Sequence, residues 1–262
     1  MIKISIITPS FNQGKFIEET IQSVLGQKYP NLEYIVVDGG STDNTRKILK
    51  KYTGKMIWIS EKDKGQSDAI NKGMRMATGD VMAFLNSDDL YAKRTLYKVA
   101  RFFTDHPKAQ WVSGDYFIIN QKKKKIRSFV RWYKRFLRLF SSYPLLRLTN
   151  YVIQPSTFWR RNVYENVGEF DVGLPYEMDY DYWLRIGEKY RLFHLEDALS
   201  FFRLHDASKS GFQYEKQFKE EIRVLEKHHI SALVIFLHKI HNAVIVFVYN
   251  WVAKMNRSKK IL

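Results

Sequence analysis

Residues 3–85 alternate between short apolar runs and amphipathic segments, and this alternation constrains the fold more than any other feature of the chain. Four runs are apolar and typical of strands: 3–8, which Pro9 should end, 32–37, 56–60 and 81–85. Three segments between them have apolar residues at helical spacing: 14–27, 44–51 and 66–77. Because strands that alternate with helices form a parallel sheet, we predict an α/β fold with helices on both faces.

Aspartates lie at or just beyond the ends of these predicted strands. Asp38 ends the second, Asp68 opens the helix after the third, and Asp88 and Asp89 follow the fourth. Ligands of open α/β sheets bind at the carboxyl edge, so these side chains should gather there. Such a set suits the hydroxyl and amide groups of a nucleotide, with a hard divalent cation on its phosphates. The alternative is an ordinary polar loop, in which Asp88 or Asp89 caps the next helix.

The positive charge of the chain is unevenly distributed. The formal net charge is +16, and between Asp115 and Glu165 twelve lysines and arginines occur without one acidic residue. Aromatic and apolar residues are interleaved with them, and the common nucleic-acid motifs are missing. We therefore expect an anionic membrane surface as a partner and no nucleic acid. Cysteine is absent and residues 1–5 do not resemble a signal peptide, so we expect a cytoplasmic location.

Two segments are candidates for contact with that membrane. The stretch 127–150, which Pro144 should break in two, begins as a basic amphipathic helix that either packs on the core or lies at the interface. A lysine run before it, 122–125, fits a solvated hairpin tip. After a charged helix at 217–229, the largely apolar segment 232–253 is long enough to span a bilayer. Polar residues in its middle favour flat attachment over a true span.

Four motifs occur in order along the chain: Thr8-Pro9-Ser10-Phe11-Asn12, Val37 to Asp43 (VDGGSTD), Asp68 to Gly73 (DAINKG) and Ser87-Asp88-Asp89. Together they resemble the family 2 glycosyltransferases with the GT-A fold, over about residues 3–210. The resemblance implies a Rossmann-like, mostly parallel sheet and an inverting transferase that uses a nucleotide-diphosphate sugar, expected to be a UDP-sugar, with Mg²⁺ or Mn²⁺. The acceptor would be a glycan or a lipid-linked group in polysaccharide biosynthesis. We predict a GT-A domain at 1–212 and a C-terminal helical segment at 213–262.

The resemblance also implies roles for single residues. Asp38 would hold the nucleobase, Asp88 the ribose or sugar, and Asp89 the metal, with Asp88 as a further metal ligand. The other donor-binding candidates are Thr8, Pro9, Phe11, Asp68 and Ser87. The Asp-x-Asp pattern of the family appears here without its first carboxylate.

Inverting transfer needs one positioned carboxylate, because the acceptor hydroxyl must lose its proton as it attacks. Asp179 and Asp181 qualify by residue type. The dipole of a predicted helix would keep Asp179 ionised, and the resemblance matches it to the base of the family, although Met178 replaces a glutamate there. Asp181 lies four residues before Arg185, which also fits a surface ion pair. We take Asp179 as the base and Asp181 as the second candidate.

Two later segments resemble parts of related transferases. The stretch 154–159 resembles one near the acceptor, although it also fits a plain edge strand. The segment 203–210 resembles one that folds over the diphosphate, where His205 would ligate Mn²⁺ and Lys209 would neutralise phosphate. A purely structural histidine is the alternative.

Two other functions compete with sugar transfer. A nucleotidyltransferase would also use aspartates and a metal, but residues 9–14 lack the glycine- and lysine-rich phosphate loop of that class. A basic membrane-binding module without catalysis is less consistent with Asp38, Asp88, Asp89 and Asp179 occurring together.

Overall fold

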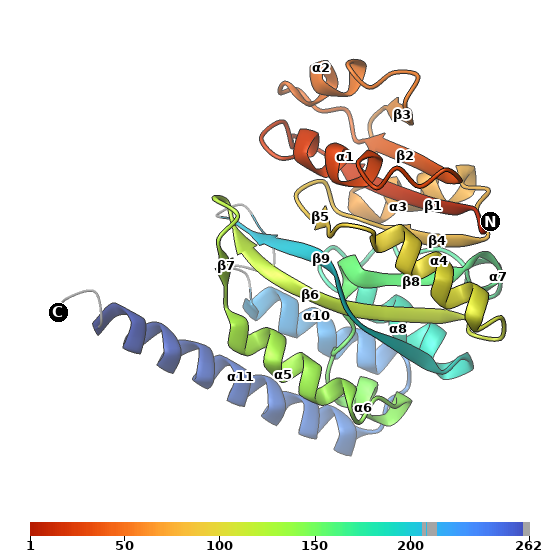
Figure 1. The fold of residues 1–262 in the computed structure, drawn as a ribbon. Helices are drawn as coiled ribbons and strands as arrows, with labels where there is room; N and C mark the ends of the chain where they lie inside the picture. Colours follow the sequence, from red (N-terminus) through yellow and green to blue (C-terminus); the bar gives the residue numbers. More distant parts are fainter. Residues whose placement is uncertain (206–207, 209–213, 259–262) are drawn as a thin grey trace.

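One mixed sheet runs through the protein (Figure 1). The structure, a computed structural model, describes residues 1–205, 208 and 214–258. Within them the strand order is β3-β2-β1-β4-β8-β6-β9-β5, with β7 beside β6. The strands are β1 (Ile4–Ser10), β2 (Leu32–Asp38), β3 (Ile57–Ser60), β4 (Val81–Phe84), β5 (Leu90–Tyr91), β6 (Trp111–Asn120), β7 (Lys125–Ile126), β8 (Thr157–Arg160) and β9 (Leu192–Leu204). The prediction of an α/β fold is confirmed, and four strand pairings among the described residues are parallel and four antiparallel.

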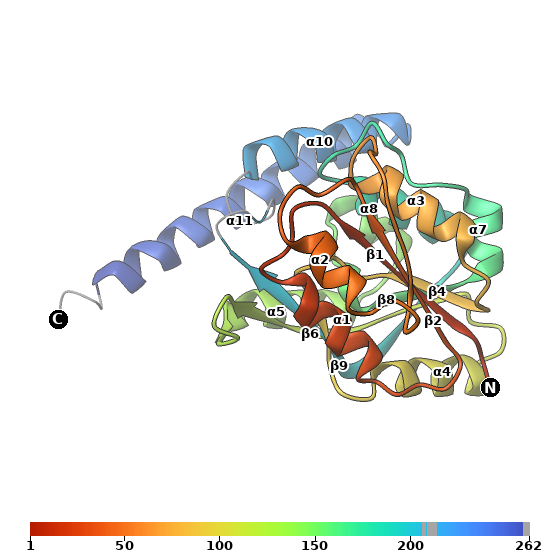
Figure 2. The ribbon, with the colours of Figure 1, turned by 90° about the horizontal axis from the view of Figure 1, so that it is seen from above.

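Helices cover both faces of this sheet, as Figure 2 shows from above. They are α1 (Ile17–Leu25), α2 (Thr45–Lys50), α3 (Gln66–Met76), α4 (Thr95–Asp105), α5 (Ser128–Arg138), α6 (Tyr143–Leu148), the 3₁₀ turn η1 (Gln154–Ser156), α7 (Arg161–Val167), α8 (Met178–Lys189), α10 (Tyr214–Lys227) and α11 (Ala232–Ser258). The helices α1, α2 and α4 pack on one face, and α3 and α8 pack on the other. Successive strand residues point to opposite faces, so Ile6 and Ile7 enter different cores.

The first four strands pair in parallel, as the alternating sequence predicted. Strand β1 continues through Pro9 to Ser10, two residues beyond the predicted end. Pairing between β1 and β4 ends at Ile7. Because Pro9 lies beyond this point, its missing N–H costs no hydrogen bond to β4. Pro9 therefore lies at the carboxyl edge of the sheet, beside the end of β2.

Beyond β4 the direction of the sheet changes. Strand β8 lies antiparallel between β4 and β6, so the edge-strand alternative for the stretch 154–159 is wrong. Strand β9 pairs in parallel with β6 and antiparallel with the two-residue β5. The lysine run 122–125 forms the exposed tip of the β6–β7 hairpin, as predicted.

The C-terminal helices pack on this second half of the sheet. Val224 and Leu225 of α10 are fully buried in the core that α8 shares, and α11 contacts α6 and α10. Pro144 stands in the first turn of α6 and separates that helix from α5, as predicted. Among the described residues, no helix combines the length and apolar character that a membrane span requires. The boundary at residue 212 stays a prediction.

Candidate active site

A cleft of about 770 Å³ opens where β1 to β4 end, between these strand ends and the start of α8. Four loops that follow parallel strands form one wall, and they contribute Pro9, Ser10, Phe11, Gln13, Gly39, Gly40, Thr42, Lys62, Gln66, Asn86, Ser87 and Asp88. The other wall includes Gln154, Tyr176, Met178, Asp179, Phe202 and Arg203. Of the predicted site residues, Pro9, Phe11, Ser87, Asp88 and Asp179 line this cleft. Gln154 also lines it, in the stretch 154–159 that resembled a segment near the acceptor. Tyr176 and Phe202 were missed, because only the tertiary fold brings them here.

Asp38 lies behind the wall of the cleft, fully buried at the end of β2. Its carboxylate accepts hydrogen bonds from the Ser41 backbone N–H at 3.0 Å, from the Ser41 hydroxyl, and from the Ser60 hydroxyl at 2.6 Å. These bonds fix the Gly39–Gly40 turn, in which Gly40 has a φ of +83° that favours glycine. Asp38 therefore shapes the loop that faces a ligand. Its direct contact with a nucleobase stays a prediction.

Asn12 joins the first two motif loops. Its side-chain oxygen accepts from the Thr42 N–H at 2.8 Å, and its own N–H donates to the Ser41 hydroxyl at 2.7 Å. Thr8, a predicted donor-binding residue, is buried and accepts a hydrogen bond from Tyr34 at 3.1 Å. Both residues support the cleft wall, and neither lines it.

Asp68 has a similar supporting position in the first turn of α3. Its carboxylate accepts from the Lys64 N–H at 3.0 Å and lies 3.5 Å from the Lys72 ammonium. The Lys64 hydrogen bond, with the Lys72 charge, lowers the pKa of Asp68, so it is ionised at neutral pH. It holds the loop before α3, which carries Lys62 and Gly65 into the cleft.

The two adjacent aspartates after β4 have different surroundings. Asp88 lines the cleft, and its Oδ2 lies 2.9 Å from Nε2 of the buried His205. Asp89 is fully buried and accepts from the Arg203 N–H of β9 at 2.8 Å through Oδ1. Burial, followed by the Asp88 charge, raises the pKa of Asp89 well above its usual range. Asp88 is the carboxylate that lines the cleft, whereas Asp89 lies behind its wall with Oδ2 buried and without a hydrogen-bond partner among the described residues. Metal binding by Asp89 stays a prediction.

Asp88 and His205 could hold a divalent cation only together with ligands from water and the substrate. In the described part of the chain, no three acidic, histidine or cysteine side chains form a ready cluster. Mg²⁺ usually takes one or two carboxylates and completes its shell with water and substrate phosphates, so one carboxylate beside an imidazole is sufficient. Arg203 of the facing wall reaches this point, where its guanidinium donates to the Asp88 carbonyl at 2.8 Å and pairs with Glu19 at 2.6 Å. Lys209 lies outside the described residues.

Asp179 occupies the first turn of α8, as predicted. Its Oδ1 accepts from the Tyr180 N–H at 2.7 Å, and Glu220 of α10 accepts from the N–H groups of Tyr176 and Glu177 just before the helix. Burial raises the pKa of Asp179 to about 6, although the Lys134 charge opposes this. The shift is opposite to the one expected from the helix dipole. At neutral pH the carboxylate is still mostly ionised, with a pKa well matched to a general base.

Asp181 is part of a buried charge cluster and lines neither cavity. Its carboxylate binds Arg185 at 2.8 Å, Lys227 at 2.9 Å and His228 at 3.0 Å. Burial opposes ionisation, but the His228 hydrogen bond and the two positive charges hold the pKa well below its usual range. The pair with Arg185 exists, yet Asp181 is fully buried, so the expectation of a surface pair is wrong. Asp181 links α8 to α10.

A second cavity of about 260 Å³ adjoins the cleft, and we call it the acceptor-side cavity. Its walls come from β6, α5, α10 and α11, and they include Tyr116, Tyr133, Lys134, Glu221 and His241. Four residues line both spaces: Gln154, Tyr176, Asp179 and Phe202. The two cavities therefore meet at the candidate base.

A sheet whose parallel strands end in a nucleotide-sized cleft, with an Asp88–His205 pair on one wall and a carboxylate on the other, has the architecture of the GT-A glycosyltransferases. The model of the family "Glycosyl transferase family 2" matches residues 5–168, which is more than half of the chain. The chain belongs to this family.

Several named proteins are similar to this chain, and the matched region covers a different share of each. The putative teichuronic acid biosynthesis glycosyltransferase TuaG of Bacillus subtilis is 40% identical over 39% of this chain and 42% of its own length. The structure of S. aureus TarS 1-349 with UDP-GlcNAc superposes with a TM-score of 0.68 at 21% identity, over 86% of this chain and 65% of that one. The mannosyltransferase PcManGT of Pyrobaculum calidifontis, with GDP-Man and Mn²⁺, gives a TM-score of 0.66 at 17% identity, over 96% and 80%. The chain thus spans less than two thirds of TuaG and of the TarS fragment.

Proposed function

We propose that this glycosyltransferase moves a sugar, with inversion, from a nucleotide-diphosphate sugar to a hydroxyl of a glycan or lipid-linked acceptor in polysaccharide biosynthesis. The observation that carries the proposal is the position of Asp179 where the two cavities meet. A base at that junction can face a donor in the cleft and an acceptor in the second cavity at once. The teichuronic acid relative supports the pathway, and the UDP-GlcNAc complex of TarS supports a UDP-sugar.

The strand-end loops bind and orient the donor. The loops around Phe11 and Gly40 are rigidly joined through Asn12, so their backbone groups are fixed before a nucleotide arrives. Lys62 and Arg203 supply positive charge to the cleft for a diphosphate. Mg²⁺ or Mn²⁺, held by Asp88 with His205, would neutralise charge on the leaving diphosphate.

Asp179 removes the proton that the acceptor loses. The acceptor oxygen attacks the anomeric carbon from the side of the acceptor-side cavity, and the bond from that carbon to the diphosphate oxygen breaks on the opposite side. The acceptor proton passes to the Asp179 carboxylate, and the electron pair of the broken bond remains on the nucleotide diphosphate. One displacement at one carbon inverts its configuration, so the product has the opposite anomeric form to the donor.

The enzyme is further proposed to work at the cytoplasmic face of a membrane as a peripheral protein. The net charge of +16 and the basic stretch 122–138 support attraction to an anionic surface. This attraction weakens with salt, because exposed charges are screened.

Donor hydrolysis tests the function without a known acceptor. Purified protein is incubated with Mn²⁺ and a panel of radiolabelled UDP-, GDP- and dTDP-sugars, and release of free sugar is measured beside the Asp179→Asn variant. We expect slow hydrolysis of one class of donor by the native protein and a large loss in the variant. A nucleotidyltransferase would instead release pyrophosphate from a nucleoside triphosphate, and that result, with no donor hydrolysed or transferred, contradicts the proposal.

A further inference from the structure

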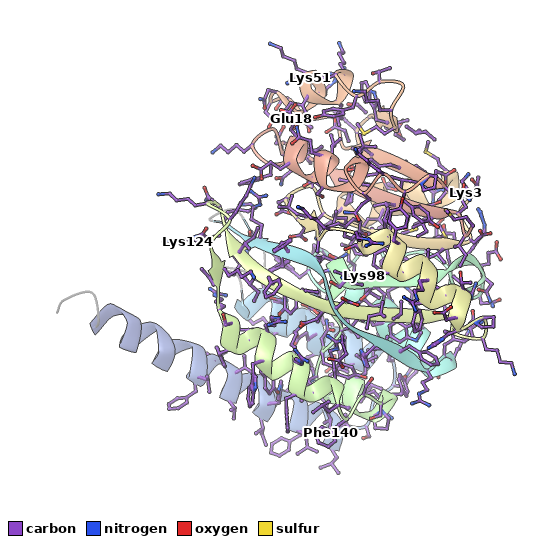
Figure 3. The ribbon with its side chains drawn as sticks, viewed as in Figure 1. Lys3, Glu18, Lys51, Lys98, Lys124 and Phe140 are labelled. Atoms are coloured by element: carbon purple, nitrogen blue, oxygen red, sulfur yellow. The ribbon has the colours of Figure 1, made fainter. Side chains whose placement is uncertain are left out.

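Exposed apolar side chains are concentrated on α5 and α11. Of seventeen large apolar side chains that are exposed in the described part of the chain, five lie on α5 or directly after it and six on α11. We call these eleven residues the α5–α11 face: Phe129, Trp132, Phe136, Leu139, Phe140, Leu233, Phe236, Leu237, Ile240, Val244 and Phe247. Figure 3 shows Phe140 and the side chains of α11 pointing down from the lower surface, away from the sheet.

The α11 residues of this face recur at helical spacing and form one stripe along the helix. Three polar residues in the middle of α11 point the other way. His238 and Asn242 are buried and hydrogen-bond Glu221 of α10 at 2.9 and 2.6 Å, and His241 hydrogen-bonds Tyr133. These polar groups are therefore paired with the protein, and the outward stripe of α11 is apolar with Lys239 exposed at its side.

The α5 part of the face is a row of aromatic rings. Trp132 and Phe136 stack at 6.1 Å between ring centroids, and Phe136 meets Phe140 edge to face at 5.3 Å. Trp132 is 68% exposed and Phe140 is 62% exposed, so most of this surface faces water. Soluble monomers rarely expose contiguous apolar patches of this kind unless a partner covers them.

The charges around the face favour an anionic bilayer over a second copy of the chain. Neither α5 nor α11 contains an aspartate or glutamate. Exposed cations lie close in sequence to the apolar residues, at the hairpin tip 122–125, at Arg135 and at Lys239. A second copy would bring like charges together, whereas anionic headgroups would neutralise them while the apolar side chains enter the acyl boundary.

We propose that the α5–α11 face docks on an anionic bilayer, and that the acceptor-side cavity behind it receives the hydroxyl of a lipid-borne acceptor. The assignment of the acceptor rests on the proposed function. The same two helices form walls of that cavity. The hydroxyl of Tyr133 on α5 is hydrogen-bonded to Nε2 of His241 on α11, with 2.5 Å between the two atoms. Docking therefore places the cavity walls at the membrane. A volume of about 260 Å³ suits one sugar-sized head group rather than a long glycan.

Cysteine labelling tests the docking, because the native chain has no cysteine. Single variants Phe236→Cys and Val244→Cys on the face, and controls Ile57→Cys and Val172→Cys away from it, carry an environment-sensitive dye. Vesicles contain one part phosphatidylglycerol to two parts phosphatidylcholine. We expect a blue shift only at positions 236 and 244, and only with vesicles. No shift with vesicles, or a shift that needs no vesicles and grows with protein concentration, overturns the proposal, and the latter indicates a second copy.

A combined variant tests the acceptor class. Leu233→Ser, Phe236→Ser and Phe247→Ser together should weaken vesicle binding by about tenfold or more, because three apolar side chains no longer enter the bilayer. The matched control, Ile57→Ser with Val172→Ser, changes exposed apolar residues elsewhere and should bind normally.

Both variants are then given radiolabelled donor and vesicles of bacterial lipid extract. In the Leu233, Phe236 and Phe247 variant, we expect the amount of labelled lipid to fall in proportion to the loss of vesicle binding. The rate at which the variant hydrolyses the donor in solution should stay unchanged. Label that enters only water-soluble acceptors overturns the lipid-borne acceptor. If the native chain hydrolyses no donor and transfers none, the proposed function fails instead, and the dye result still decides the docking.

Discussion

The two halves of the sheet are built differently. Residues 4–84 form four strands that all pair in parallel and are joined by helical crossovers. From residue 111 onward the directions are mixed, because β6 pairs in parallel with β9 but antiparallel with β7 and β8. Under the proposed function, the first half is the donor half, whose strand-end loops would bind the nucleotide sugar, and the second is the acceptor half, whose cavity would receive the acceptor.

Acidic residues also differ between the halves. In the donor half, Asp38 and Asp68 accept backbone N–H groups and hold loops. In the acceptor half, Asp181 is held by three basic side chains, and Asp179 keeps a raised pKa near one lysine.

Asp179→Asn should have the largest effect, because the change removes the proton acceptor at the junction of the halves. Turnover should fall by about two to four powers of ten, and donor binding should survive. The measurements are kcat and the nucleotide Kd by calorimetry. Asp181→Asn is the matched control two residues away. If it abolishes turnover per folded molecule while Asp179→Asn is mild, the assignment of the base is reversed.

Asp88→Ala tests the donor half. It removes the carboxylate that faces the cleft, so Mn²⁺-dependent nucleotide affinity should fall by at least about tenfold, as is typical of changes around a metal site. Asp89→Asn is the comparison, because its side-chain oxygen still accepts from the Arg203 N–H, so the buried hydrogen bond is kept while the second carboxylate is removed. Binding of nucleotide is measured with Mn²⁺ and with chelator. A greater loss in the Asp89 variant would make Asp89 the main ligand.

Asp181→Ala should lower the stability of the acceptor half. The free energy of unfolding should fall by about 1–3 kcal/mol, since Arg185 and Lys227 remain partly solvated when their partner is lost. The pKa of Asp181 is held low in the fold, so its contribution is complete above the ordinary aspartate value of about 4 and is lost as the pH falls below it. Urea unfolding of the native protein and the variant is measured at pH 7 and at pH 3, and the difference in free energy of unfolding should be smaller at pH 3. The same difference at both pH values would contradict the role of Asp181.

Lys134→Met should have the smallest effect, a shift of the pH profile. Activity of the native enzyme should rise as the pH passes about 6 and Asp179 loses its proton. The Lys134 charge lowers that pKa, so its removal should move the rise to higher pH. Arg135→Met, which changes an exposed cation on the same helix, should leave the profile in place. The test is kcat/KM against pH, and identical profiles for both variants would exclude the role of Lys134.

The donor half of the fold could be predicted from sequence because its signals are local. Strand, turn and helix follow one another in 4–84, and the register of β1 with β2 needs no distant partner. The reversal at β8 could not be predicted, because its four residues gain their direction from pairing with β4 and β6. The two-residue β5 is likewise a strand only because β9 lies beside it.

The site was predictable to the same extent. Residue types at strand ends identified the Asp88 segment, and the start of a helix identified Asp179. The sequence alone did not show that Asp89 turns inward to a backbone group 114 positions later. Nor did it show the burial of Asp181 beside Lys227, the last residue of α10, and His228, which follows it. In each case the decisive partner is remote in sequence, and a local pattern carries no information about it.

The hydrogen bond between Asp88 and His205 has a consequence for how the cleft forms while the chain is being translated. The imidazole comes 117 positions after the carboxylate, and the N–H that fixes Asp89 comes 114 positions after it. At translation rates of about 5–20 residues per second, the ribosome needs about 6 to 23 s to make that intervening chain. During this time the loops that follow β1 and β2 can form from neighbouring segments, but Asp88 and Asp89 stay without their partners. The nascent protein therefore completes this end of the cleft only when β9 has been made and has inserted between β6 and β5.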